Sequence, residues 1–334
     1  MKIGLTFILK EENIGKTQYL SEFDSIEVIQ RLEKAIQASG QDVIKLGFGK
    51  KFIENLIEYK PDIVFNYAEG IYGSSREAQI PSILEMLQIP IIGSSAFCMM
   101  LTQNKHVCNL YCREKGIPTP RGIWTDTPNI ERKTFQHLNY PLIVKPSREG
   151  SSYGIDYDSI VNDFGELQNQ TEIILEEFQQ PILVEEYIQG REINVGIIGN
   201  DPPKAFPLLE TIFGSDETHE NILTYEMIKE ERGFTETKAE IDTKIEKRIE
   251  KIALTAYIIL HCTDYARIDI RISKDMQPYI IDVNPTPSLQ ENSSLPACAY
   301  LANYSYDDLI KEIVDVGISR NFLSQKYLVN NKMQ

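Results

Sequence analysis

Two stretches of the sequence carry residue types that could bind a phosphate-bearing ligand. The first, residues 142–154, is an apolar run that ends in Lys145 and continues into a loop with Gly150, Ser151, Ser152 and Gly154. An apolar run between prolines is typical of a buried strand, which would place the lysine at the strand's open end. Glycine and serine let backbone N–H groups turn toward an anion, and lysine adds a point charge. On this window alone, a phosphate loop and a solvent-facing turn are equally good interpretations.

The second stretch, residues 266–284, alternates polar and apolar residues in two segments. Arg267, Asp269 and Arg271 alternate with isoleucines, and Asp282 and Asn284 repeat the pattern after a turn-like linker. A period of two predicts a hairpin with its polar residues on one face. Three oxygen ligands there (Asp269, Asp282 and Asn284) suit Mg²⁺ shared with phosphates. The alternative is a hairpin whose charged face meets solvent, but the Asp-x-Asn-Pro-x-Pro ending favours a metal site.

Together, three motifs resemble the ATP-grasp superfamily and, within it, the D-alanine–D-alanine ligase-like family. They are the Lys-Pro-Ser-Arg-Glu-Gly-Ser-Ser loop, the Arg-Ile-Asp strand and the Asp-Val-Asn-Pro-x-Pro-Ser strand, and the resemblance covers the chain from about residue 60 to residue 300. It implies an α/β fold, α+β in the ATP-binding half, with an N-terminal parallel-sheet domain. It also implies an ATP-dependent carboxylate–amine ligase that works through an acyl phosphate with two Mg²⁺ ions, for which Mn²⁺ can substitute.

The resemblance further implies a set of nucleotide contacts. Residues 185–188 match the family's adenine-contacting hinge, and Glu192 matches a ribose-binding carboxylate that can accept two hydrogen bonds. By itself, a lysine in a first helical turn usually faces solvent, and Glu185 and Glu186 would pass for an exposed edge. Lys229 is expected at the γ-phosphate, although its segment matches the family's lid with a one-residue offset. The expected contacts are Lys105, Lys145, Ser151, Ser152, Glu185, Glu186, Tyr187, Ile188, Glu192 and Lys229.

Catalytic and substrate-binding roles also follow from the resemblance. Arg267, Ser151 and Ser288 are the expected catalytic residues, with Arg267 and nearby amides stabilising a tetrahedral oxyanion. Ser288 replaces a family glycine whose amide serves the oxyanion, and that amide survives the change. Ser293 matches the residue that holds the second amino acid's carboxylate, although a serine there commonly caps a helix. The expected substrate contacts are Glu22, Glu69, Arg267 and Ser293, and the two glutamates could equally be surface carboxylates.

Two departures from the family pattern fall where the substrate would sit. The glycine-rich Ser-x-Glu turn after the first strand is absent, and Ala68-Glu69-Gly70 stands where the family has a His-Gly turn. These changes favour a related ligase for another amino acid or amine over a D-alanine–D-alanine ligase of peptidoglycan synthesis. A catalytically inactive ATP-binding scaffold is a third reading, which the complete set of expected phosphate and metal residues opposes.

Composition narrows the class of protein. With 334 residues and 42% hydrophobic residues the chain can bury large cores, and its net charge of −15 argues against binding nucleic acid or anionic membrane. Cys108 and Cys112 are spaced to share a metal, but without further ligands nearby the five cysteines are expected as buried free thiols. The first apolar run is expected as a strand and no stretch has the length of a membrane span, so a cytoplasmic protein is expected. The resemblance implies small-molecule amino-acid substrates. The family habit adds a homodimer.

Chain length and the order of expected elements predict two or three domains. Residues 1–100 alternate strand and helix, which indicates a domain with a parallel sheet whose site lies near residues 66–70 and 93–95. The resemblance implies that this domain binds the first amino acid. No Gly-x-Gly-x-x-Gly follows the first strand, which argues against dinucleotide binding. Residues 101–181 are expected as a central ATP-grasp subdomain with helices at 102–115 and 161–178. Residues 182–325 would carry the metal site and a lid at 214–237, before a polar tail at 326–334.

Overall fold

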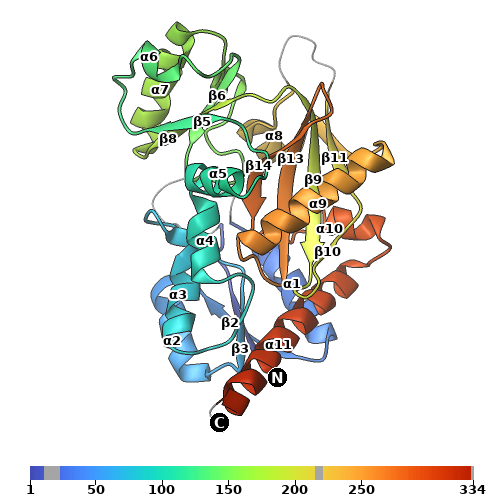
Figure 1. The fold of residues 1–334 in the computed structure, drawn as a ribbon. Helices are drawn as coiled ribbons and strands as arrows, with labels where there is room; N and C mark the ends of the chain where they lie inside the picture. Colours follow the sequence, from blue (N-terminus) through green and yellow to red (C-terminus); the bar gives the residue numbers. More distant parts are fainter. Residues whose placement is uncertain (11–22, 215–220, 332–334) are drawn as a thin grey trace.

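Three sheets form the body of the protein (Figure 1). The computed structural model describes residues 1–10, 23–214 and 221–331, with side chains described up to residue 321. The first sheet lies at the bottom of Figure 1, the second at its upper left, and the third on the right. Within the described ranges, no helix is long and apolar enough to cross a membrane.

The first sheet is parallel throughout, with strand order β2-β1-β3-β4. Its strands are β1 (Lys2–Thr6), β2 (Asp42–Gly47), β3 (Ile63–Asn66) and β4 (Ile91–Ile92). The helices between them are α1 (Ile26–Ala38), α2 (Gly49–Tyr59), the 3₁₀ turn η2 (Arg76–Ala78) and α3 (Gln79–Met86). Helix α1 buries an apolar stripe that includes Ile29, Leu32 and Ile36, as its periodicity predicts. The predicted N-terminal parallel sheet is confirmed.

The second sheet is antiparallel, with strand order β5-β8-β6-β7. Its elements are β5 (Gly122–Thr125), α6 (Arg132–Phe135), β6 (Leu142–Pro146), η3 (Tyr157–Ser159), β7 (Ile160–Val161), α7 (Phe164–Phe178) and β8 (Ile182–Glu186). Two expected helix starts were wrong. Residues 102–103 end helix α4 (Ala96–Gln103), and Asn104 caps the next helix, α5 (Lys105–Glu114). The helix expected from residue 161 begins at Phe164, because Val161 pairs with β6.

The third sheet has six strands, in the order β12-β11-β9-β13-β14 with β10 beside β9. They are β9 (Gly190–Ile198), β10 (Lys204–Ala205), β11 (Leu209–Phe213), β12 (Phe234–Lys238), β13 (Tyr265–Ser273) and β14 (Pro278–Asn284). Helix α9 (Thr243–Ile259) buries Ile249, Ala253 and Ala256 against the sheet. Part of the lid expected at residues 214–237 is regular secondary structure. Residues 225–230 form helix α8 (Tyr225–Glu230), and residues 234–238 form β12.

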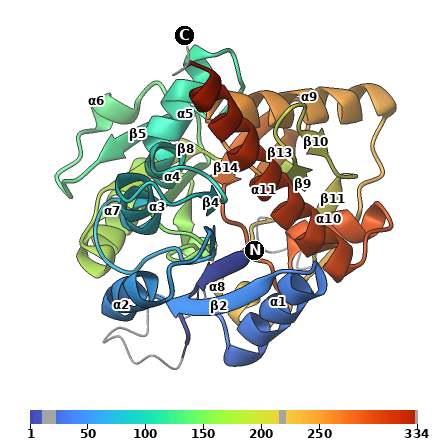
Figure 2. The same ribbon diagram turned by 90° about the horizontal axis from the view of Figure 1, so that it is seen from below.

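The end of the chain joins the first and third sheets. Helix α10 (Ser294–Leu301) packs on β9, and helix α11 (Tyr306–Asn331) runs between α10 and β4, as Figure 2 shows. Residues 326–331, expected in a polar tail, continue α11. Leu309, Ile310, Ile313 and Val314 share one core with residues of β1, β3 and β4. One apolar face of the first sheet is thus covered by the last helix.

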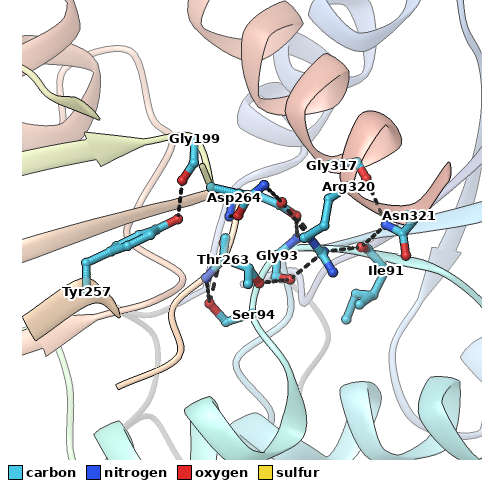
Figure 3. A network of polar contacts seen from close by, with 11 residues as sticks. Ile91, Gly93, Ser94, Gly199, Tyr257, Thr263, Asp264, Gly317, Arg320 and Asn321 are labelled. Carbon is cyan, nitrogen blue, oxygen red and sulfur yellow. Dashed lines mark hydrogen bonds and ion pairs between the residues drawn. The ribbon is translucent and has the colours of Figure 1, made fainter. Parts of the chain in front are cut away.

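A buried polar network reinforces this junction (Figure 3). The Asp264 carboxylate is fully buried and accepts hydrogen bonds from the Gly93 N–H at 2.8 Å and the Asn200 side chain at 2.9 Å. Two guanidinium nitrogens of Arg320 also donate to it, each at 2.8 Å. Ser94 accepts a hydrogen bond from the Thr263 N–H at 3.0 Å. Residues 93–95 were expected near a substrate site, and instead they belong to this structural network or, in the case of Ser95, cap α4.

Candidate active site

The β13–β14 hairpin places the predicted polar residues on one face. Asp269 pairs with Asp282 and Arg267 with Asn284, and all four line one cavity. The isoleucines of β13 at 268, 270 and 272 point the other way into the core beneath α9. A register shift after Asp269 leaves Ile281 on the cavity side beside Asp282. The alternation therefore gave the correct face of both strands.

Each of the two cavity carboxylates on this hairpin is held by a cation. Arg267 donates to both Asp269 oxygens, at 2.7 and 2.8 Å, and Asn284 Nδ2 donates to Asp269 at 3.0 Å. Lys105 Nζ lies 2.6 Å from Asp282 Oδ1. Burial alone would raise the pKa of Asp282, but the cations of Lys105, Lys145 and Arg267 together outweigh it and leave that pKa below its ordinary value. The Asp282 carboxylate is thus available as an anion.

The first cavity has an apolar region and a charged region, and its volume is about 880 Å³ including the space at its mouth. Lys145 and Glu185 form a buried ion pair at 2.7 Å in the charged region, and Asn109 donates a further hydrogen bond to Glu185. The apolar lining comes from both neighbouring sheets and from the 222–228 segment: Ile143, Ile155, Tyr187, Ile188, Ile222, Leu223, Ile228 and Ile281. A flat ring fits the apolar region, and a phosphate chain fits the basic one.

The end of β8, the linker that follows it and the start of β9 join the second sheet to the third, and they line the first cavity. Glu186 is held by Arg121 and by the backbone and side chain of Asn139. Glu192 is buried and accepts a hydrogen bond from Arg271 Nη1 at 3.2 Å. Burial raises the pKa of Glu192 despite this neighbour. Arg271 Nε has no hydrogen-bond partner among the described residues, so this part of the cavity retains an unused donor.

The loop after β6 turns back over the cavities. Ser151 and Ser152 adopt left-handed conformations with φ of 48° and 53°, and Gly154 has φ of 80°. A Cβ atom at Gly154 would lie 2.7 Å from atoms of Phe178 and of Pro146, which explains why glycine is needed there. Ser151 lines both this cavity and a second one. A loop folded in this way can present backbone N–H groups to an anion.

The second cavity, with a volume of about 840 Å³ including its mouth, adjoins the first. The residues that line both come from α5, the loop after β6, and the hairpin: Lys105, Glu149, Gly150, Ser151, Arg267, Asp282 and Asn284. We call these seven residues the shared wall. The far side of the second cavity belongs to the first sheet and to residues 285–290. Two molecules bound in the two cavities would therefore meet at the shared wall, among cations and carboxylates.

Most of the predicted site residues that the structure describes line one of the two cavities, and two of them do not. Of the expected nucleotide contacts, Lys229 alone does not line the first cavity: it is exposed, and Ile228 lines the cavity instead. Ser293 precedes α10 and donates to the Ser288 and Gln290 carbonyls, at 2.7 and 2.8 Å, without lining either cavity. Glu69 and Ser288 line the second cavity, whereas Glu22 lies outside the described residues.

Sequence reasoning missed several residues of the second cavity. Asp24 is 6% exposed and accepts a hydrogen bond from Gln290 at 2.9 Å. Burial raises the pKa of Asp24 to about 6, although Gln290 and Tyr67 oppose the shift. Its one sequence signal is that an acidic residue stands two positions before the first residue of α1. Gln103 has no signal beyond standing two residues before Lys105.

Comparisons with known proteins agree with this geometry. Residues 117–315 match the family model described as the D-ala D-ala ligase C-terminus. A D-alanine–D-alanine ligase of Aquifex aeolicus is 30% identical over 296 residues, 87% of this chain and 94% of that protein. The uncharacterized protein y4sG of Sinorhizobium fredii is 31% identical over 301 residues, 86% of each. The fold is similar to that of the Bacillus anthracis D-alanine–D-alanine ligase complexed with ATP, with a TM-score of 0.78, 24% identity, and 97% and 99% of the two chains covered.

Proposed function

The chain belongs to the D-alanine–D-alanine ligase-like family of ATP-grasp enzymes and is an ATP-dependent ligase, and from this premise we propose that it joins two amino acids, or an amino acid and an amine-bearing small molecule, through an acyl phosphate. The observation that carries the proposal is the shared wall. It places Lys105, Arg267 and two metal-type ligands between a cavity suited to a nucleotide and a cavity suited to an acid.

In this proposal, ATP occupies the first cavity. The apolar region takes the adenine ring, the backbone of residues 186–188 meets its edge, and Glu192 accepts hydrogen bonds from the ribose hydroxyls. Lys145 and Lys105 hold phosphate oxygens as point charges, with the serine loop closing over them. Arg271, whose Nε is unused among the described residues, orients Glu192.

Asp269, Asp282 and Asn284 would hold Mg²⁺. Their oxygens are the hard ligands that Mg²⁺ prefers, and they share one face of the hairpin. Asp269 and Asp282 are now paired with Arg267 and Lys105, cations that a metal ion can replace. Three side chains are fewer ligands than Mg²⁺ needs, so phosphate oxygens would complete the set. When bound, the metal supplies charge neutralisation at those oxygens.

The chain's own residues perform the remaining work at the shared wall. Lys105 and Arg267 neutralise the phosphoryl group that passes to the substrate carboxylate, as ADP leaves. An amine then attacks the acyl carbon, the C–N bond forms, and phosphate leaves. Arg267 and the Ser288 N–H would stabilise the charge that develops on the carbonyl oxygen. The 149–154 loop excludes water that would hydrolyse the intermediate.

We propose that Asp24 is the carboxylate that binds the first substrate on the side of the first sheet. It lies in the second cavity, away from the phosphate side, and its carboxylate can accept hydrogen bonds from an ammonium group. Near pH 7.5 a carboxyl with a pKa of about 6 is mostly ionised. The first substrate would thus be held at two points, with its carboxylate toward Arg267 and its ammonium toward Asp24.

A true D-alanine–D-alanine ligase is the second candidate, favoured by the similarity to the Aquifex aeolicus enzyme over most of both chains. Against it stand the Ala68–Gly70 turn and the polar lining of the second cavity. An inactive nucleotide-binding scaffold is opposed by the complete shared wall.

One screen separates the three candidates, which are a related ligase, a true D-alanine–D-alanine ligase and an inactive scaffold. ATP hydrolysis is measured with single and paired D- and L-amino acids, and products are identified by mass spectrometry. We expect ADP and a ligated product in equal amounts only when an acid and an amine are both present. If D-alanine joined to D-alanine were the sole ligated product, the second candidate would be favoured. Nucleotide binding without ADP release across the whole panel would overturn ligation.

A further inference from the structure

The second cavity contains a buried side chain that the ligation steps do not use. Gln103 is the last residue of α4, two positions before Lys105, and only 6% of it is exposed. Neither its amide nitrogen nor its amide oxygen has a hydrogen-bond partner among the described residues. Buried polar groups are normally paired, since leaving them unpaired destabilises the fold. An amide that lines a ligand cavity in this state is suited to a bound molecule.

A second, weakly satisfied polar group lies on the same side of the cavity. Thr286 is 9% exposed and lines the cavity, and its hydroxyl contacts only the Met99 thioether, at 3.7 Å, in the described structure. Sulfur is a weak acceptor. Met99 precedes Gln103 by four residues in α4, so the two share one helix face. Thr286 and Gln103 therefore flank the same part of the cavity.

The rest of the lining offers little to an alkyl side chain. Among the described residues that line the second cavity, largely apolar side chains come only from Tyr67, Val283, Pro285 and Pro287. Thr102, beside Gln103, already donates its hydroxyl to the Cys98 carbonyl at 2.9 Å. Among the buried, uncharged polar side chains of this lining, the unused hydrogen-bonding capacity thus lies at Gln103 and Thr286.

We propose that Gln103, with Thr286, forms a specificity subsite for an uncharged polar side chain on a substrate of the proposed ligation. An amide with a free donor and a free acceptor complements a hydroxyl or a carboxamide, which also carry both. A carboxylate would leave the Gln103 oxygen unpaired, and an alkyl group would leave both amide atoms unpaired. The substrate class is therefore amino acids with hydroxyl or carboxamide side chains. This inference rests on the proposed ligase function and names its substrate.

The test compares polar and alkyl substrates in the wild-type enzyme and in the Gln103→Met variant. Serine, threonine, asparagine and glutamine are set against alanine and 2-aminobutyrate, in both configurations, and kcat/KM is measured for each. The wild-type enzyme should prefer a polar substrate to its alkyl analogue by about 10- to 100-fold, because the analogue leaves buried groups unpaired. Gln103→Met, close in volume, should reduce that ratio about tenfold or more.

Gln170→Met is the matched control. Gln170 is also 6% exposed, but it lies on α7 and lines neither cavity, so its substitution should leave the substrate ratio unchanged. The melting temperature gives an independent reading: Gln103→Met should not lower it, since the substitution removes an unpaired buried amide.

The outcomes separate this inference from the ligase function. Ligation that favours alkyl substrates, or a substrate ratio that Gln103→Met leaves intact, would overturn the subsite while ligation stands. A lower melting temperature for Gln103→Met would give the amide a structural role instead. Absence of ADP release with every pair would remove the ligase proposal and the subsite with it.

Discussion

The protein buries carboxylates in two regions, and they differ in how completely their neighbours are satisfied. Asp264 has four hydrogen bonds from three residues and joins segments more than 200 residues apart (Figure 3). Around the two cavities, Asp269 and Asp282 are paired with cations, yet Arg271 Nε and the Gln103 amide have no partner within the described part of the chain. A cluster that satisfies itself stabilises the fold, whereas one with unused groups is prepared for a ligand.

Asp282→Asn should have the largest effect on activity of the changes considered. The substitution keeps the shape but removes the charge that faces Lys105 and the proposed metal, so kcat should fall at least 10³-fold, about 4 kcal/mol. ADP release under saturating substrates measures it. Asp275→Asn, in the exposed turn of the same hairpin, is the control and should keep wild-type activity. Equal activity of the two variants would remove Asp282 from the site.

Asp264→Asn should instead affect stability. It leaves Arg320 without its charged partner in a buried network, which typically costs about 3 kcal/mol or more. Urea unfolding followed by circular dichroism measures the loss, and the folded fraction at low temperature should retain turnover. Asp315→Asn, on the same helix as Arg320, breaks an exposed pair with Lys311 and should leave stability nearly unchanged. If both variants were equally stable, Figure 3 would depict a network of little energetic importance.

Asp24→Asn tests the pH dependence of the second cavity. Because the pKa of Asp24 is raised to about 6, kcat/KM for the acid substrate should decline as pH falls through 6 and the carboxyl becomes protonated. The variant should lose this dependence and about 10- to 100-fold in kcat/KM, while KM for ATP changes little.

The same raised pKa predicts the effect of pH on stability. A carboxyl that binds its proton more tightly when folded makes the wild-type protein lose stability as pH rises from about 4 to 6, with no further loss above. Asp24→Asn should flatten that part of the curve of melting temperature against pH. A curve identical to wild type would argue that Asp24 titrates normally.

Gly154→Ala should have the smallest effect and sharpens the role of the serine loop. The added Cβ would clash with Phe178 and Pro146 at a positive φ, which should displace the loop and raise KM for ATP several-fold, about 1 kcal/mol. Gly116→Ala carries similar backbone strain, with φ of 76° and nothing within 4 Å of its Cβ. It should lower stability slightly without changing KM. An equal rise of KM for ATP in both variants would show that the loop does not contribute to nucleotide binding.

The sequence predicted those parts of the molecule whose signals are local. The β13–β14 hairpin was readable because alternation fixes which side chains share a face, and Lys145 was readable because its strand and loop are contiguous. Strand β12 was missed because its Thr-Glu-Thr-Lys run is polar, as an edge strand can be. Asp24 and Gln103 were missed because burial comes from contacts between distant segments. The partners of Asp264 lie 56 to 171 residues away, beyond any pattern in a window.

The covering of the first sheet by α11 has a consequence for synthesis on the ribosome. Ile3, Phe65 and Ile92 share their core with Ile310 and Ile313, so the strands of this sheet leave the ribosome long before the helix that shields that face. A nascent chain halted near residue 300 would expose this apolar surface and leave Asp264 without Arg320. Stalled or nonsense-truncated chains of this protein should therefore depend on chaperones and be rapid targets of proteolysis, even when every cavity residue has been translated.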